Sequence, residues 1–148
     1  MRPKSFSRFF VFGILLLAGC APSLMSADEF PIKAGAVWEL TLEGPNATSR
    51  TFVLRGKPSL DSDYISYDGL AGEDDVLAIY YKNGMLATIV FLEDNKKSFD
   101  DRRAIYCFTF KEGPIWAGNG LIGSWARDVE PISSREIRRL PRCELRPK

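Results

Sequence analysis

The stretch VLAIYYKNGMLATIVFL, residues 76–92, decides the fold that the sequence predicts. Two runs rich in β-branched, aliphatic and aromatic residues flank the dipeptide Asn83-Gly84. Asn-Gly favours a two-residue type I′ turn, because both residues accept a positive φ angle. We therefore expect a β-hairpin in which Lys82 lies opposite Met85. Both faces of the two runs are largely apolar, so we expect the hairpin to be central and covered on both sides, or to line a cavity.

The same period-two alternation continues along the chain on both sides of the hairpin. In residues 37–43, Trp38, Leu40 and Leu42 fall on one face of an expected strand. The further strands expected are 50–55, 64–67, 104–111, two short pieces around Asn119-Gly120 within 113–127, and 143–146. Spacing and turn chemistry predict a mainly β fold, a small antiparallel β-barrel or sandwich of about seven to eight strands with one short C-terminal helix.

The expected helix lies in PISSREIRRLPR, residues 131–142. Ser133 with Glu136 fits a capping box at its start, and Pro141 ends it. Four arginines are spaced along one face of that helix: Arg135, Arg138, Arg139 and Arg142. We interpret them either as a patch for anionic lipid headgroups or another polyanion, or as the solvated face of an amphipathic helix.

The first twenty residues are typical of an export signal. Three basic residues precede an apolar run, residues 9–17, which is too short for a permanent membrane helix of about 20 residues. The run ends in Leu17-Ala18-Gly19-Cys20, which resembles the lipobox of bacterial lipoproteins. The resemblance implies that acyl chains such as palmitate are attached at Cys20, that the signal is cut before it, and that the lipid holds the protein on a membrane. An ordinary secretory signal that happens to contain a cysteine is the alternative.

The lipobox resemblance also implies a location and divides the chain. Ala21 follows the cysteine, at the position where Asp resembles an inner-membrane retention signal. We therefore expect a lipid-anchored protein of the bacterial cell envelope, on the periplasmic face of the outer membrane if the cell is diderm. The expected organisation is a signal peptide at 1–19, a lipidated tether at 20–35 and a single β domain at 36–148.

With Cys20 lipidated, two of the three cysteines remain, Cys107 and Cys143. An oxidising compartment permits a disulfide, and two cysteines allow one pairing. The bond would close a loop of about 36 residues and contribute roughly 3–4 kcal/mol to the free energy of unfolding in the chain-entropy model. The alternative is two unpaired thiols, one of them buried in a strand.

The residues that usually carry catalysis and metal binding are scarce. The chain has no histidine, which removes Ser-His-Asp and Cys-His catalysis and every histidine metal site. Carboxylates gather in 61–64 and 68–75, which we interpret as a solvated acidic loop rather than a calcium site or a glycosidase carboxylate pair. We therefore expect no enzymatic activity, no metal and no cofactor.

The charge of the expected mature chain argues against nucleic-acid binding. Removing the three basic residues of the signal takes the formal net charge from +1 to −2. The remaining basic excess lies only in residues 135–148, behind an acidic body. This distribution is not that of a nucleic-acid-binding protein.

The chain has three tryptophans, which is a large number of bulky apolar side chains for a small domain: Trp38, Trp116 and Trp125. They either pack in the core or line a ligand pocket. The stretch from Gly35 to Trp38 resembles the Gly-x-Trp signature of lipocalin-like (calycin) barrels, although the spacing here is Gly-x-x-Trp. That resemblance implies a barrel and a small apolar ligand.

The function that we expect is that of a non-enzymatic, lipid-anchored envelope protein whose β domain binds a partner or supports an assembly. One alternative is a lipocalin-like carrier of a small apolar ligand, which needs an open cavity lined by aromatic residues. Another is an inhibitor of a lysozyme or protease, which needs a protruding ordered loop such as 61–75 or 93–103. The expected partners are the membrane, through the anchor, and an unknown envelope protein or small apolar ligand, and not a nucleic acid.

Overall fold

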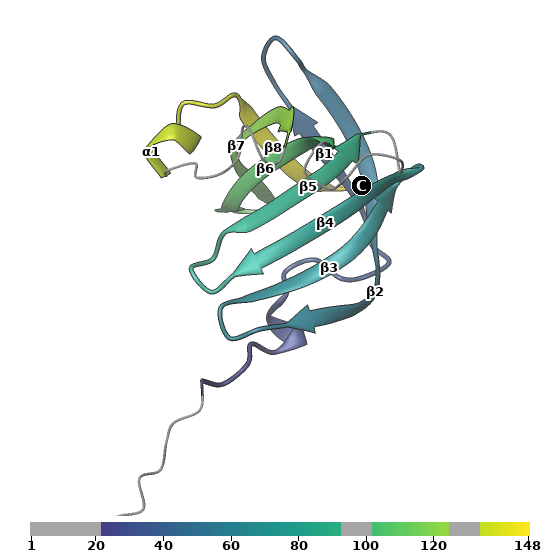
Figure 1. Cartoon of the computed structure of the whole chain (residues 1–148), viewed down its shortest axis with the longest axis vertical. Coiled ribbons are helices and arrows are strands. Elements are labelled where there is room, and N and C mark those ends of the chain that lie inside the picture. Colours follow the sequence, from purple (N-terminus) through teal and green to yellow (C-terminus); the bar gives the residue numbers. More distant parts are fainter. Residues whose placement is uncertain (1–21, 93–101, 125–133) are drawn as a thin grey trace, which may run out of the picture.

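In the part of the chain that the computed structural model describes, residues 22–92, 102–124 and 134–148, eight strands close into one antiparallel barrel (Figure 1). Each strand pairs with its neighbours in the sequence, and β1 pairs with β8 to close the ring. The strands are β1 (Val37–Leu42), β2 (Thr48–Leu60), β3 (Tyr64–Ala71), β4 (Asp74–Tyr81), β5 (Leu86–Leu92), β6 (Arg103–Glu112), β7 (Ile115–Ser124) and β8 (Arg142–Pro147). A 3₁₀ turn, η1 (Ala27–Glu29), and a short helix, α1 (Ser134–Ile137), accompany them. The predicted mainly β class is confirmed, and the sheet forms a barrel, which leaves no unpaired strand edge.

The up-and-down order of the strands gives the barrel two distinct ends. At one end β1 begins and β2, β4, β6 and β8 finish; residues 25–36, with η1, pack across it, so we name this the plugged end. At the opposite end β1 finishes, and α1 lies on the connection from β7 to β8. In Figure 1, η1, drawn in purple, lies below the barrel, and α1 lies at the upper left, far from η1.

β4 and β5 form the expected hairpin, but the predicted register is wrong by one residue. Val76 pairs with Val90, and the amide of Tyr81 donates to the carbonyl of Met85 at 2.9 Å. Three residues, 82–84, therefore form the loop instead of two. Gly84 takes a φ angle of 86° and donates to the carbonyl of Tyr81 at 2.9 Å. This is the three-residue loop in which a turn is followed by a left-handed glycine.

The change of register decides which side chains of β5 enter the barrel. A slip of one residue moves every side chain of a strand to the other face. As a result Leu86, Thr88 and Val90 point inward beside β4, whereas Ile89 and Phe91 point outward. The side chain of Asn83 accepts a hydrogen bond from the amide of Met85 at 3.0 Å, which supports the longer loop.

Two sequence expectations about loops are also wrong. The segments 61–64 and 68–75, interpreted as a solvated acidic loop, are largely strand: β3 contains the predicted strand 64–67 and continues to Ala71, β4 begins at Asp74, and only the turns 61–63 and 72–73 remain. Their carboxylates lie on an outer barrel surface, where a strand tolerates polar side chains facing water. The second expectation, two strand pieces around Asn119-Gly120, is replaced by the continuous ten-residue strand β7. Glycine inside a strand marks a close approach of other atoms rather than a turn here.

The side chains that point into the barrel form one core cluster, which includes Leu40, Leu54, Ile65 and Leu145, each 0% exposed. A second cluster lies on the outer face of β5 and β6: Ile89, Phe91, Ala104 and Tyr106. β5 is therefore buried on both faces from Leu86 to Phe91. The expectation of cover on both sides is confirmed for β5, whereas the outward residues of β4 are half-buried or exposed, and in a closed barrel no strand is central.

Residues 25–36 belong to the packed domain, although the sequence assigns most of them to a tether. Met25, Phe30 and Ile32 are buried members of the core cluster. The amide of Met25 donates to the carbonyl of Asp61 at 2.9 Å, and the amide of Gly35 donates to the carbonyl of Leu54 at 3.0 Å. We name residues 25–36 the plug. A plug inserts isolated side chains instead of one periodic face, so no sequence period reveals it.

Candidate functional site

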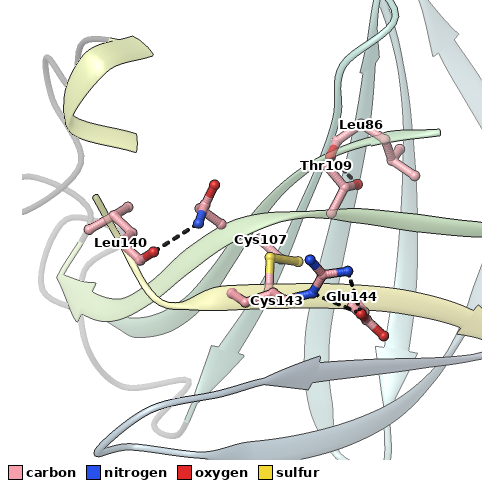
Figure 2. Close-up of a disulfide and its surroundings, with 8 residues drawn as sticks. Leu86, Cys107, Thr109, Leu140, Cys143 and Glu144 are labelled. Carbon is pink, nitrogen blue, oxygen red and sulfur yellow. Dashed lines mark hydrogen bonds and ion pairs between the residues drawn. A yellow bond between two sulfur atoms is a disulfide. The ribbon is translucent and has the colours of Figure 1, made fainter. Parts of the chain in front are cut away.

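The barrel interior is where a carrier would hold its ligand, and the described side chains fill it. Eight strands enclose a space just wide enough for side chains or one small ligand. Here the inward side chains that are less than 2% exposed include Leu40, Leu42, Phe52, Leu54, Ile65, Leu86, Val90, Ile105 and Leu145. The inward hydroxyl of Thr109 donates to the carbonyl of Leu86 at 3.0 Å (Figure 2), so a polar group in the core is satisfied by the barrel itself. In the described ranges, the interior is thus a packed core.

The predicted disulfide between Cys107 and Cys143 is present inside the barrel (Figure 2). Both cysteines are 0% exposed. The bond joins β6 to β8 and crosses β7, which lies between them. Neighbouring strands lie about 4.8 Å apart, so strands two places apart in a flat sheet would be separated by roughly 10 Å. The Cα atoms of the two cysteines are only 5.9 Å apart, so the sheet folds sharply at β7.

Two glycines of β7 make room for this fold and for the disulfide. Gly118 pairs with Cys143, and Gly120 pairs with Cys107. A Cβ atom at Gly120 would press on the carbonyl of Tyr106 and lie 3.2 Å from the Sγ of Cys143. A Cβ atom at Gly118 would instead clash with the carbonyl of Phe108, so Gly118 allows the close approach of β6 and Gly120 leaves room for the disulfide. The glycines that looked like a turn in the sequence are therefore part of the disulfide site.

The described members of the predicted tryptophan pocket are core residues. Trp38, on β1, is 9% exposed and Trp116, on β7, is 5% exposed, and both belong to the interior cluster. The third member, Trp125, lies outside the described residues. Trp116 packs edge-on against Tyr80, with 6.1 Å between ring centroids. For these two residues, core packing is the alternative that the geometry supports.

A row of aromatic rings joins the plug to the barrel core, and the sequence analysis did not predict it. Phe30 of the plug packs edge-on against Tyr67, with centroids 4.8 Å apart, and also approaches Tyr80 at 6.3 Å. Tyr80 in turn contacts Trp116, so the four rings form one line across the plugged end. The sequence signal was the pair of large apolar residues around Pro31 in an otherwise small and polar segment.

The predicted arginine face is only partly formed. α1 ends at Ile137, so the helix holds four residues and Arg142 is already the first residue of β8. The chain leaves the helix through a turn in which the amide of Arg139 donates to the carbonyl of Glu136 at 3.0 Å. Arg135, Arg138 and Arg139 are exposed. The proposed capping residue Ser133 lies outside the described residues.

Arg142 belongs instead to an ion-pair cluster on the outer face of β8. Its guanidinium lies 2.8 Å from Glu144, whose other carboxylate oxygen lies 2.6 Å from Arg146. Hydrogen bonds from Arg146 and from Arg142 hold the pKa of Glu144 below its ordinary value. The hydrogen bond to Glu144 raises the pKa of Arg142. The charge of Arg142 is therefore compensated locally, which removes it from a surface patch for anions.

The described ranges offer little for a metal or a membrane-crossing helix. Among the residues with described positions, no three His, Cys, Asp or Glu side chains converge in a way that could hold a metal ion. No helix in that part of the chain is long and apolar enough to cross a membrane. Cys20, the predicted lipid-bearing residue, lies outside it.

Comparison with known proteins adds no relative to this picture. No family model, no curated protein and no solved structure matches the chain.

Proposed function

We propose that this chain is a non-enzymatic, lipid-anchored protein of the bacterial cell envelope that binds its partner through the outer surface of the barrel. One observation carries the choice of the outer surface. The inward positions of the described strands hold buried side chains from Leu40 to Leu145, and the plug covers one end of them. A partner of such a barrel meets the outside of the sheet or one of its ends.

The anchor is supported by the order of the sequence signals. A basic start, a short apolar run and the Leu17-Ala18-Gly19-Cys20 ending precede the first packed residue, Met25, by only a few positions. The disulfide between Cys107 and Cys143 fits an exported protein, because disulfides persist in oxidising compartments. The pairing leaves Cys20 as the one cysteine without an internal partner.

The two alternative functions receive less support. A lipocalin-like carrier needs an interior cavity, whereas Trp38 and Trp116 are packed in the core. An inhibitor of an envelope-attacking enzyme needs a protruding loop, whereas 61–75 is mostly strand and 93–101 lies outside the described residues. Eight-stranded up-and-down barrels do include lipocalins, but a shared fold does not transfer a function.

Replacing the lipid-bearing thiol tests the proposal. Cys20→Ser should move the protein from the membrane fraction to the soluble fraction, because without its acyl chains the barrel has no covalent anchor. The measurement is fractionation of the expressing cells, with the mass of the mature N-terminus read from the wild type. Cys107→Ser is the matched control, because it removes a cysteine but keeps Cys20, and it should stay with the membrane. A Cys20→Ser protein that remains membrane-bound would contradict the anchor.

A further inference from the structure

The distance between the anchor and the barrel is short. Met25 is 7% exposed and its amide is bonded to Asp61 at 2.9 Å, so the chain is held by the barrel from this residue onward. Five residue steps separate Cys20 from Met25. An extended chain spans at most about 3.5 Å per residue, so these steps reach at most about 17 Å. The headgroup layer of a bilayer is itself roughly 5–8 Å thick on each side. An anchor at Cys20 therefore brings the plugged end to the membrane surface.

The exposed large apolar side chains gather at this same end. Among the described residues they are Leu24 at 64%, Val37 at 41%, Leu60 at 40%, Tyr64 at 37% and Phe110 at 50% exposed. Leu24 precedes the plug, Val37 begins β1, Leu60 ends β2, Tyr64 begins β3, and Phe110 lies near the end of β6. None of the five lies at the end where α1 is attached, although the connections 93–101 and 125–133 of that end are outside the described residues. Scattered exposed apolar residues need no explanation, but exposed apolar residues beside one turn form a patch that does.

Three of these side chains surround the point where the plug meets the barrel. Leu60 and Tyr64 flank the turn whose residue Asp61 accepts the hydrogen bond from Met25, and Leu24 is the residue before Met25. Tyr64 pairs with Tyr81 across β3 and β4, with 6.2 Å between ring centroids. Tyrosine is enriched at membrane–water interfaces because its ring is apolar and its hydroxyl is polar. We name Leu24, Leu60 and Tyr64 the apolar rim.

Charge at the plugged end does not by itself favour an anionic surface. The described lysines all lie at or near this end and are exposed: Lys33, Lys57, Lys82, Lys111 and Lys148. Carboxylates are equally common there: Asp28, Glu29, Asp61, Asp63 and Glu112. Long lysine side chains can keep their ammonium groups in water while apolar neighbours enter the interface. Any attraction to this end therefore comes from the apolar side chains.

We infer that the plugged end lies on the lipid bilayer, with the apolar rim inserted among the headgroups and α1 turned away from the membrane. This inference rests on the proposed anchor at Cys20. It reverses the role expected for Arg135, Arg138 and Arg139, because the exposed arginines of α1 and its following turn then face away from the membrane, where a partner would meet them. It also assigns the plug a position between the lipid and the barrel core.

The test uses the mature chain, residues 20–148, which contains every described residue. Because Cys107 and Cys143 are joined, Cys20 is its only free thiol. This thiol is coupled to maleimide-bearing phosphatidylethanolamine in phosphatidylcholine vesicles, and amide hydrogen exchange is compared with that of the uncoupled chain. We expect exchange in the turns 61–63 and 82–85 to slow by about tenfold or more, and exchange in the turns 43–47 and 72–73 to stay unchanged.

Matched variants separate the rim from the mere presence of a tether. A triple variant, Leu24→Asp, Leu60→Asp and Tyr64→Asp, should remain coupled but lose the slowing, because charged groups resist insertion. The single variant Leu24→Asp should lose part of the slowing. Leu24 is exposed and lies outside every strand, so we expect this variant to fold like the wild type. The control changes the other end, with Arg135→Glu, Arg138→Glu and Arg139→Glu, and should keep the slowing in full.

Several results would overturn the inference. These are equal slowing at both ends, slowing only at the opposite end, and a triple variant that is slowed like the wild type. Adding phosphatidylglycerol should not change the slowing, and slowing that appears only with this lipid would mean that charge, not the rim, holds the barrel. Because the lipid is attached chemically, none of these results depends on acylation in the cell. A failure of the anchor itself is seen separately, in the fractionation of Cys20→Ser.

Discussion

Glu144 is the clearest case of a single residue whose chemistry is set by its neighbours. It lies on the outer face of β8 between Arg142 and Arg146 and is 14% exposed as a side chain, whereas the two arginines are 49% and 59% exposed. Its carboxylate accepts hydrogen bonds from both guanidinium groups. The bonds favour the charged form, so the pKa of Glu144 is lowered. Ion pairs this close to water contribute modestly to stability.

Glu144→Gln should therefore reduce the loss of stability on acidification. A carboxyl group whose pKa is lowered by folding stabilises the protein above its ordinary pKa, and this contribution is lost as the pH falls through the lowered value. At neutral pH the variant should be less stable by up to about 1 kcal/mol, and at acidic pH the difference should vanish. Urea unfolding across this pH range measures it. Glu73→Gln, in the exposed turn after β3, is the control, and an equal change in both variants would contradict the role of the arginines.

At the scale of the element, β7 shows that a glycine-rich sequence typical of a turn can form one continuous strand. Its glycines lie where β6 and β8 approach each other to form the disulfide. The absence of Cβ atoms at Gly118 and Gly120 allows the sharp fold of the sheet. Asn119 lies between them, and its side-chain amide donates to the carbonyl of Leu140 at 2.8 Å, which holds the start of β8 against β7.

Gly120→Ala should lower the free energy of unfolding by about 1–3 kcal/mol, because the new methyl group overpacks a site bounded by backbone and by the disulfide. The same change should cost less in a Cys107→Ser, Cys143→Ser background, where Sγ of Cys143 is gone. Denaturant unfolding of the four proteins gives the coupling between the two sites. A Gly120→Ala protein as stable as the wild type would show that the sheet at β7 has room for a methyl group beside the disulfide.

At the scale of the whole molecule, the plug links the predicted anchor to the barrel core. It connects to the sheet through the amides of Met25 and Gly35 and through the ring of Phe30, which packs on Tyr67. A terminal segment held by few contacts can open locally without unfolding the rest. The plug is therefore the part of the core that we expect to open first.

Phe30→Ala should open the plug more often than it unfolds the barrel. Loss of a buried phenylalanine ring typically costs about 3–5 kcal/mol, but here the cost is limited by the free energy that holds the plug in place. Amide hydrogen exchange should rise at Met25 and Gly35 while the amides of β5 and β6 stay protected. Leu24→Ala, which alters a side chain 64% exposed beside the plug, should change neither. Uniformly faster exchange throughout the barrel would show that the plug and the sheet unfold as one unit.

The sequence by itself determined the mainly β class, the places of most strands, the presence of the hairpin, the pairing of Cys107 with Cys143 and the lack of histidine. These follow from local rules: alternation of two in Val37–Leu42, turn residues at Asn83-Gly84, and two cysteines left to pair in 107 and 143. The anchor at Cys20 is likewise a prediction from local pattern, and it still awaits its fractionation test.

Only the tertiary structure decided the rest. The register of β5 depended on whether the loop holds two residues or the three residues 82–84. The role of Gly120 depended on the disulfide that joins β6 to β8 across β7. Phe30 is buried because the plug crosses the end of the barrel and places its ring against the core. The disulfide and the packing of Phe30 involve residues that are distant in the sequence, whereas period and propensity act only between near neighbours. The register is a local feature, but Asn-Gly is compatible with both a two-residue and a three-residue loop. The surface that we propose to meet the membrane has both origins: Leu60 and Tyr64 flank one hairpin turn, whereas Leu24 reaches it through the hydrogen bond from Met25 to Asp61.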